Sequence, residues 1–480
     1  MNKIAEKIIP GGKRELLKVA WPLIMSTASY SIMHFFDRVM LTRYSDTTAA
    51  AATGAGILAF ALISLFLGIA GYTTTFVAQY HGSGDKNMCS RSFWHGVYFS
   101  LACGLLYPFT FRPIGLWIFD YMNHDPDVLN AEKIYFGTLA FGAIFPLTSN
   151  SISAFFSGRG KTQVIMWVTI SVACINIFLN YCLIFGNLGA PELGIRGAAI
   201  ATVFSSFCGM FLYVILISRK NIRTEYNIFK NMAFRWSTLK NLIKYGGPSG
   251  ISFSLDIMAF SIFVLLIGHI GRVQLIASNI ALSINTLSFL PMLGFSMATT
   301  ILVGKYMGMG DKNSAEKSAY SGVKCATVYM TFMGILFVLM PEVFFWFFKG
   351  KGISSQMFAE IFGYGKWLLV MLAFLGVFDA VNVTFSGSLK GAGDTWFTMW
   401  ISVLASWLFF APAVYLVTDV FKAGIFWAWG CFVMYVALLA LFYWIRFSIG
   451  RWKKIDIKEK PKPPPPVISE VVAEAQIIDN

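Results

Sequence analysis

Residues 80–87 read YHGSGDKN, and residues 306–313 read YMGMGDKN. Six of the eight letters agree across an offset of 226 positions, and the same register continues on both sides of this octapeptide. It also pairs Lys18 with Lys244, Pro22 with Pro248, Gly68 with Gly294, Thr73 and Thr74 with Thr299 and Thr300, Val77 with Val303, and Gly96 with Gly322. Further along the chain the offset becomes 233, where SGRGKTQVIMW (157–167) pairs with KGAGDTWFTMW (390–400). We therefore predict an internal duplication, with the seven extra residues in the loop around KGKGISS (349–355).

The composition places both copies in a membrane. Of 480 residues, 56% are hydrophobic and 13% are charged, whereas soluble domains carry about 25% charged residues. Many apolar stretches reach the roughly 20 residues that cross a bilayer as a helix, and the weak alternating segments of a membrane β-barrel are not seen. We predict an all-α polytopic membrane protein with twelve transmembrane helices, at 16–40, 49–80, 92–118, 132–156, 163–185, 194–218, 239–267, 274–306, 318–341, 358–388, 396–418 and 422–449.

The duplication divides these spans into two six-helix lobes. Because six is an even number, both copies enter the membrane in the same orientation, and a pseudo-two-fold axis along the membrane normal relates them. We expect an N-lobe at 1–218, a cytoplasmic linker at 219–238, a C-lobe at 239–449 and a tail at 450–480. The tail is charged and then proline-rich, without apolar periodicity, which predicts disorder.

The net charge of +14 is explained by topology. On alternate sides of the twelve spans, Lys and Arg number 28 and 10. The positive-inside rule places the richer side, which holds both termini, in the cytoplasm. We therefore expect a multi-pass protein of the cell (inner) membrane, with weak attraction to anionic lipid as an additional effect, and no nucleic-acid partner.

Almost all acidic residues lie in loops, at span edges or in the tail, and three do not: Asp37 in the first span, Asp256 in the seventh and Asp379 in the tenth. A carboxylate at the centre of a bilayer costs about 3 kcal/mol or more, so such acids usually face a cavity and serve an ion or a substrate. The structural alternative is a hydrogen bond between helices or, for Asp37, an interfacial position paired with Arg38.

The duplication does not repeat these acids. The offset of 226 matches Asp37 with Phe263 and Asp256 with Tyr30, and the offset of 233 matches Asp379 with Pro146. Symmetric packing has no need of asymmetric acids, so this observation favours a function for them.

Polar residues accompany Asp37 at helical spacing. Tyr30 and His34 share its face of the first span, and Asn176 and Asn180 share a face of the fifth. A lone His is more often a packed or interfacial residue, and one Asn can join two helices. Two Asn on one face, together with Asp37, indicate ligands for a hard cation such as Na⁺.

The C-lobe acids have similar company. Ser249 and Ser252 share the face of Asp256, while Asn382 and Ser386 share that of Asp379. Oxygen-rich clusters suit Na⁺ or exchangeable protons and do not suit thiophilic metals. The cysteines and histidines are dispersed, and no catalytic or nucleotide-binding motif is present. We expect no enzyme activity and no cofactor besides Na⁺ or H⁺ as the coupling ion.

The repeated octapeptide itself has a local structural interpretation. Gly82 and Gly84 suit the C-terminus of a helix, and Asp85 or Asn87 can cap the next helix. A phosphate-binding loop is disfavoured, because the spacing of a P-loop and its preceding strand are absent.

Four segments carry a resemblance to a known family: FFDRVMLTRYS (35–45), NIFLNYCLIFGNLGAPELGIRGAAIAT (176–202), SLDIMAF (254–260) and FDAVNVTFSGSLKGAGDT (378–395). To about residue 449 the chain resembles multidrug and toxic compound extrusion (MATE) transporters of the NorM-like branch. The resemblance implies a V-shaped pair of lobes that expels organic cations in exchange for Na⁺ or H⁺. It implies cation sites at Asp37, Asn176 and Asn180 in the N-lobe, and at Asp256 and Asp379 in the C-lobe.

The chain departs from the family pattern at three positions. Residue 375 is Leu, where NorM-like relatives have a Tyr near the ion; residue 279 is Asn, where Gln is commoner; and His34 beside Asp37 is unfamiliar in the family. These differences bear on how the C-lobe site, including Asn279, coordinates its ion and on which ion is used.

Two rival functions remain open at this point. A lipid-linked oligosaccharide flippase of the same superfamily would need cations in its cleft, and Lys366 is the main candidate. A membrane enzyme or a non-transporting scaffold is the other class, against which stand the missing motifs and the three acids. We predict a secondary active antiporter that acts as a monomer in the lipid bilayer on small organic cations.

Overall fold

The computed structural model describes residues 9–122, 124–348 and 355–459, and this part of the chain contains helices and no strand. Its α-helices are α1 (Lys13–Tyr44), α2 (Asp46–Gly71), α3 (Thr73–Gly82), α4 (Lys86–Tyr121), α5 (Pro126–Gly142), α6 (Ile144–Gly158), α7 (Thr162–Phe185), α8 (Gly194–Ser218), α9 (Lys220–Glu225), α10 (Trp236–Ile270), α11 (Arg272–Met309), α12 (Lys312–Leu339), α13 (Pro341–Trp346), α14 (Ser355–Ala392), α15 (Thr395–Leu404), α16 (Ala411–Tyr415) and α17 (Ile425–Ile449). Short 3₁₀ or π segments are η1 (Asn187–Gly189), η2 (Ile228–Asn231), η3 (Ala405–Phe410), η4 (Leu416–Val420) and η5 (Arg451–Lys454).

Each of the twelve predicted spans corresponds to one helix or to a broken helix. Ten are long and apolar enough to cross a membrane, and α5 with α6, bent by 43°, form an eleventh. The twelfth is α1, whose middle contains Ser, Thr, Tyr and His residues that lower its hydropathy. The predicted all-α polytopic membrane fold is confirmed.

Two further predicted spans are interrupted. The second is broken at Tyr72 between α2 and α3. The eleventh runs through two π-helical segments, η3 and η4, on either side of α16, which begins next to Pro412. Proline removes a backbone donor, and π segments inside α-helices are frequently found at functional sites.

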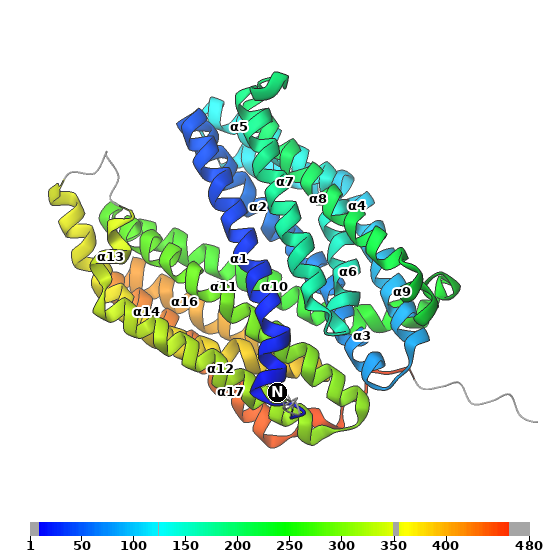
Figure 1. Ribbon diagram of the computed structural model, residues 1–480. Helices are drawn as coiled ribbons and strands as arrows, with labels where there is room; N and C mark the ends of the chain where they lie inside the picture. The colour runs from blue at the N-terminus through cyan, green and yellow to red at the C-terminus, as the bar shows by residue number, and fades with distance from the viewer. Residues whose placement is uncertain (1–8, 123, 349–354, 460–480) are drawn as a thin grey trace, which may run out of the picture.

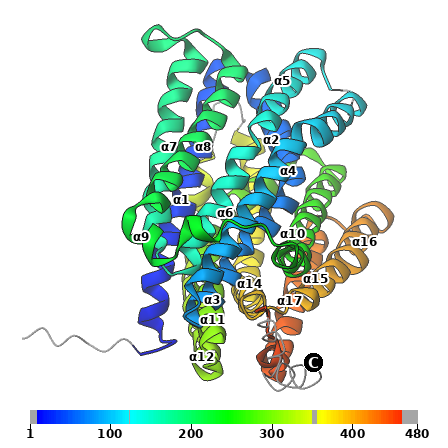
Figure 2. The same cartoon turned by 90° about the vertical axis from the view of Figure 1, so that its right-hand side faces the viewer.

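The helices form two groups in Figures 1 and 2, one from α1 to α8 and one from α10 to α17. They meet near the N-terminal end of α1 and diverge toward α5 and α13 (Figure 1). One apolar cluster of buried side chains comes only from residues 259–452 and another only from residues 41–199. A third joins α1 to α11, α12 and α14. We call the helix group from α1 to α8 the N-half and the group from α10 to α17 the C-half.

The two quoted octapeptides contribute to a mutual contact between the halves. A Cβ atom added to Gly82 of α3 would lie 2.0 Å from the carbonyl oxygen of Lys305, and one added to Gly308 of α11 would lie 1.9 Å from that of Gln79. Gln79 and Lys305, like Gly82 and Gly308, are related by the offset of 226. Each half therefore presents the same glycine to the same backbone position of the other half.

The turns that follow are also alike. Gly84 and Gly310 have φ angles of +79° and +78°, a conformation that glycine adopts without a Cβ penalty. Asp85 then accepts a hydrogen bond from the backbone N–H of Met88, and Asp311 accepts one from Ser314, at 2.9 and 3.0 Å. The predicted capping role of Asp85 is confirmed. The bond from Ser314 holds the pKa of Asp311 below its ordinary value.

The linker and the tail both lie against the N-half. Ser90 and Trp94 of α4 donate hydrogen bonds to the carbonyl of Ile228 in the linker, at 3.2 and 2.7 Å. Beyond η5, Ile457 is 2% exposed and packs in the N-half core, while the Glu459 backbone N–H donates to the Tyr80 hydroxyl at 2.9 Å. The prediction of disorder from residue 450 is therefore wrong for 450–459, because Ile457 is buried and Ile455 packs partly buried against the same cluster. Residues 460–480 lie outside the described residues, as do residues 349–354 of the predicted insertion.

Candidate functional site

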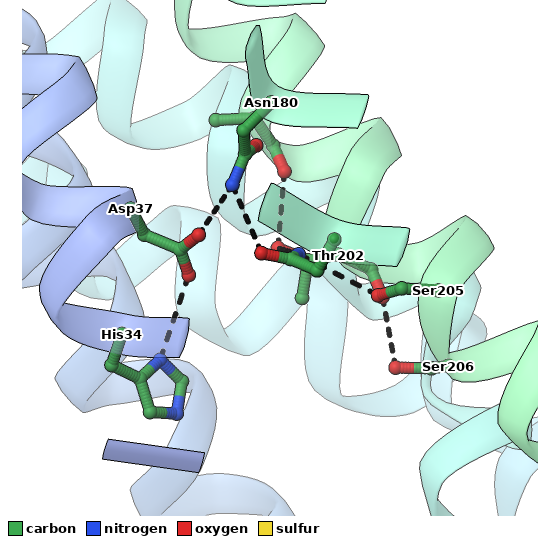
Figure 3. A network of polar contacts seen from close by, with 8 residues as sticks. His34, Asp37, Asn180, Thr202, Ser205 and Ser206 are labelled. Atoms are coloured by element: carbon green, nitrogen blue, oxygen red, sulfur yellow. Dashed lines mark hydrogen bonds and ion pairs between the residues drawn. The ribbon is translucent and has the colours of Figure 1, made fainter. Parts of the chain in front are cut away.

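Asp37 of α1 meets both predicted asparagines of α7 inside the N-half. Asp37 is 8% exposed, and Asn176 and Asn180 are fully buried. The Asn180 side-chain Nδ2 donates to Asp37 Oδ1 and, at 3.0 Å, to Asn176 Oδ1 (Figure 3). Asn176 Nδ2 in turn lies 3.4 Å from Thr202 Oγ1 and 3.5 Å from Ser205 Oγ of α8. The structure thus brings three of the predicted site residues into one network.

One acceptor in this network is free among the described residues. Asn180 Oδ1 is buried and has no hydrogen-bond partner there, although a buried polar atom without a partner is costly. Together with Asp37 and the Thr202 hydroxyl it offers carboxylate, amide and hydroxyl oxygens. Such ligands suit a hard cation, and Asp37 alone can take a proton.

His34 and Tyr30 lie at the margin of this site. His34 Nδ1 is 3.7 Å from Asp37 Oδ2, and the His34 side chain is 65% exposed. Tyr30, two turns before Asp37, is 47% exposed and takes no part in the network that Figure 3 shows. His34 therefore contacts the carboxylate from the outside, while the amides of α7 hold it from the inside.

The C-half acids are held mainly by hydroxyl groups. Asp256 Oδ1 accepts hydrogen bonds from Ser402 Oγ at 2.5 Å and from the Tyr435 hydroxyl at 3.5 Å. Ser252 Oγ lies 3.4 Å from Asp256 Oδ2. On α14, Asn382 Nδ2 donates to Asp379 Oδ1 at 3.2 Å, and Asp379 is 8% exposed.

Tyr435 of α17 interacts electrostatically with both C-half acids, Asp256 and Asp379. Leu375, at the position where the family offers a Tyr, is only 1% exposed. A hydroxyl group thus approaches Asp256 from α17. Asn279 is exposed on α11, and within the described chain no hydrogen bond joins its side chain to either acid.

Lys390 is a charged neighbour of Asp256 that the sequence analysis missed. It stands eleven residues after Asp379 on α14, a spacing that returns to the same helix face. The predicted span ended at residue 388, whereas α14 continues to Ala392. Lys366, by contrast, is exposed beside the ring of Trp367.

Four hydroxyl residues of these networks were also missed: Thr202, Ser205, Ser402 and Tyr435. A single hydroxyl in an apolar helix is a weak signal, because it can bond to the carbonyl one turn before it. Thr202 does so with Ala198 and Ser205 with the Thr202 carbonyl, both at 3.0 Å. Only the packing of α8 on α7, and of α15 and α17 on α10, places these groups beside the acids.

The sequence matches a family model described as MatE over residues 22–182 and 248–416. It is 27% identical over 459 residues to a "Probable multidrug resistance protein NorM" of Thermotoga maritima, covering 94% of this chain and 96% of that protein. It is 28% identical over 433 residues to a protein of the same name from Bacillus subtilis, covering 89% and 92%.

Solved structures share the fold. One, titled as the outward-facing conformation of a multidrug resistance MATE family transporter, superposes with a TM-score of 0.84 at 19% identity, covering 92% of this chain and 97% of that one. A eukaryotic MATE transporter superposes with a TM-score of 0.78 at 19% identity, covering 92% and 96%. The arrangement of two helical halves is therefore one that known transporters adopt.

Proposed function

The chain belongs to the MATE family of transporters, and from this we propose that it is a secondary active antiporter that exports organic, often cationic compounds in exchange for Na⁺ or H⁺. The family consists of transporters and not of enzymes. The named relatives are multidrug resistance proteins. The observation that carries the proposal is that each half holds carboxylates among oxygen ligands inside membrane helices, at Asp37 and at Asp256 with Asp379.

These carboxylates give the exchange a physical basis. An ionised carboxylate attracts either a coupling cation or a cationic substrate, and one occupant lowers the affinity for the other. A ligand shifts a conformational equilibrium only by its differential affinity for the two states. Binding of Na⁺ or H⁺ at the site would therefore release the substrate on one side and favour the return of the ion-loaded carrier.

The contact between the halves supports alternating access. At the N-terminal end of α1, Glu15 Oε1 lies 2.9 Å from Lys305 Nζ of α11, and the Tyr306 hydroxyl donates to Glu15 Oε2 at 2.6 Å. These bonds join the two halves at the end opposite to where the halves diverge. A rocking motion that opens this end must break them.

The flippase alternative is not favoured. It requires cations that can hold a pyrophosphate, but Lys366 is exposed and Lys390 has the opposite charge of Asp256 in its surroundings. The names of the relatives point to multidrug resistance.

The orientation of the protein in the membrane follows from its charge distribution. We propose that the protein lies in the cell membrane with cytoplasmic termini, supported by the excess of Lys and Arg on the side of both termini. We further propose that it functions as a monomer. The small organic cations would then leave the cytoplasm at the expense of an inward ion gradient.

Transport in everted vesicles tests this function. Uptake of a fluorescent organic cation would be followed after steps in Na⁺ concentration or in pH, for the wild type, Asp379→Asn and the control Asp127→Asn on the exposed first turn of α5. We expect ion-driven uptake by the wild type and the control and its loss in Asp379→Asn. Equal uptake by all three would refute the role of the carboxylate, and no response to either ion would refute antiport.

A further inference from the structure

Glu132 of α5 is a second buried carboxylate in the N-half, and it takes no part in the Asp37 network. Its side chain is 2% exposed, and its neighbours Ala131, Tyr135 and Phe136 belong to a buried apolar cluster. A carboxylate in such surroundings is costly unless it is paired or protonated.

The partner of Glu132 is a histidine at the rim of the protein. His124 Nδ1 lies 2.9 Å from Glu132 Oε2, and the His124 side chain is 34% exposed. The other carboxylate oxygen lies against α2, where a Cβ atom on Gly54 would be 2.6 Å from Glu132 Oε1. The glycine thus leaves room for the carboxylate between α5 and α2. The helix that carries Glu132, α5, lies at the end of the N-half opposite the chain's N-terminus (Figure 1).

Tyr135 connects this pair to the Asp37 network. It follows Glu132 by three residues and so lies on the same face of α5. Tyr135 is 8% exposed, and Asp37 and the Thr202 side chain lie in its surroundings. From the rim inward, the polar groups therefore follow the order His124, Glu132, Tyr135 and Asp37.

We propose that His124 and Glu132 form a proton-binding pair through which the N-half is loaded from the face opposite the N-terminus, so that the proton is the coupling ion of this half. This inference rests on the proposed antiport function and names its ion. Histidine exchanges its proton near neutral pH. His124 is partly exposed and its Nδ1 lies 2.9 Å from the buried carboxylate of Glu132, so a proton taken up at the rim can pass to Glu132. Tyr135 offers the hydroxyl between the pair and Asp37.

The other charged groups nearby do not replace His124 as the partner of Glu132. Lys133 is paired with Asp120 of α4. Arg112 of α4 lies against Gly137 and 5.2 Å from the ring centre of Phe141, one to two turns further along α5. Exposed charges on the elements around the pair are Arg38 on α1, Asp46 on α2, Asp125 before α5, Asp127 on α5 and Arg196 on α8.

The test is a pH profile of transport in proteoliposomes that contain the full-length protein. Glu132→Gln, His124→Gln and the control Asp127→Asn would be compared at a fixed substrate concentration, with the pH stepped on the face that carries His124. We expect Glu132→Gln to lower the proton-driven rate about five-fold or more, which is the lower range of coupling between sites. His124→Gln should displace the midpoint of the profile, and Asp127→Asn should match the wild type.

Two further comparisons separate the outcomes. If Glu132→Gln is poorly folded, His124→Gln decides alone, because its side chain is partly exposed and it reports the same midpoint. If both variants show the wild-type pH profile of transport while Asp37→Asn is inactive, the proposed proton pair is refuted and the antiport function stands. A wild type that does not respond to any ion gradient would instead refute the proposed function.

Discussion

The N-half and the C-half share their scaffold and differ in their acids. The glycines that let the halves approach, Gly82 and Gly308, occupy equivalent positions and meet equivalent carbonyl groups. In the N-half, amides of α7 hold Asp37, whereas in the C-half hydroxyls of α15 and α17 hold Asp256, near Lys390. The duplication has thus kept the geometry of the crossing helices, while each half has its own chemistry for binding an ion or a substrate.

The largest expected effect is on the shared scaffold. Gly82→Ala and Gly308→Ala each place a Cβ atom about 2 Å from a backbone carbonyl, and no change of rotamer can relieve that contact. Overpacking costs about 1–3 kcal/mol and sometimes more. Because this contact involves backbone on both sides, we expect the upper end of that range and a similar loss for the two variants. Thermal unfolding in detergent, followed by tryptophan fluorescence, measures it.

Matched controls lie elsewhere in each half. A Cβ atom on Gly56 of α2 or on Gly430 of α17 meets no heavy atom within 4 Å. Replacing a helical Gly by Ala at such a site gains up to about 1 kcal/mol. If only one of Gly82→Ala and Gly308→Ala melts below the control of its own half, the equivalence of the two halves at this contact is refuted.

The next effect concerns the acids that the halves do not share. In Asp37→Asn and Asp256→Asn the amide oxygen can still accept the bonds from Asn180 and Ser402, so the charge is lost while the packing stays. We expect each variant to transport at least about ten-fold more slowly, equivalent to about 1.4 kcal/mol. Asp37→Asn should also lose its response to the coupling ion, because the unpartnered Asn180 oxygen lies beside it. Rates measured across ion concentrations test this, and an unchanged ion response in Asp37→Asn contradicts it.

The sequence predicts the shared features better than the differing ones. The offset of 226 and the helical period depend on local or repeated patterns, so the spans and the capping by Asp85 follow from them. Asp37, Asp256 and Asp379 stand out because a charge inside a membrane span is costly. Ser402 and Tyr435 do not stand out, since their role depends on the packing of distant helices.

Two other misses arise at the boundaries of spans. Lys390 lay beyond the predicted end of the tenth span, although α14 continues past it. Glu132 stood at the predicted start of the fourth span, where a carboxylate can reach water and pays no desolvation free energy. Its burial arises from the closeness of α2 at Gly54, which periodicity within one helix does not encode.

A smaller effect is expected at Lys390. The variant Lys390→Met removes a positive charge that repels cations from Asp256, so the half-saturating concentration of the coupling ion should fall about two- to ten-fold, by Coulomb's law at protein-like dielectric. Lys366→Met is the control, because Lys366 is exposed on the same helix. The measurement is initial transport rate against ion concentration. Equal curves for the two variants would show that Lys390 does not influence the ion site.

The smallest effect returns to the repeated turn. Asp85→Ala and Asp311→Ala each remove one hydrogen bond to the first turn of a helix, and loss of such a cap costs about 1 kcal/mol. The pKa of Asp311 lies below its ordinary value. The Asp311 carboxylate therefore contributes its full stabilisation at pH values above the ordinary pKa, and this stabilisation disappears as the pH falls through the lowered pKa. At neutral pH we expect equal, small decreases in melting temperature for both variants, with Lys312→Ala unchanged. A large decrease in only one of them would mean that the two turns, although alike in sequence and backbone, differ in what they support.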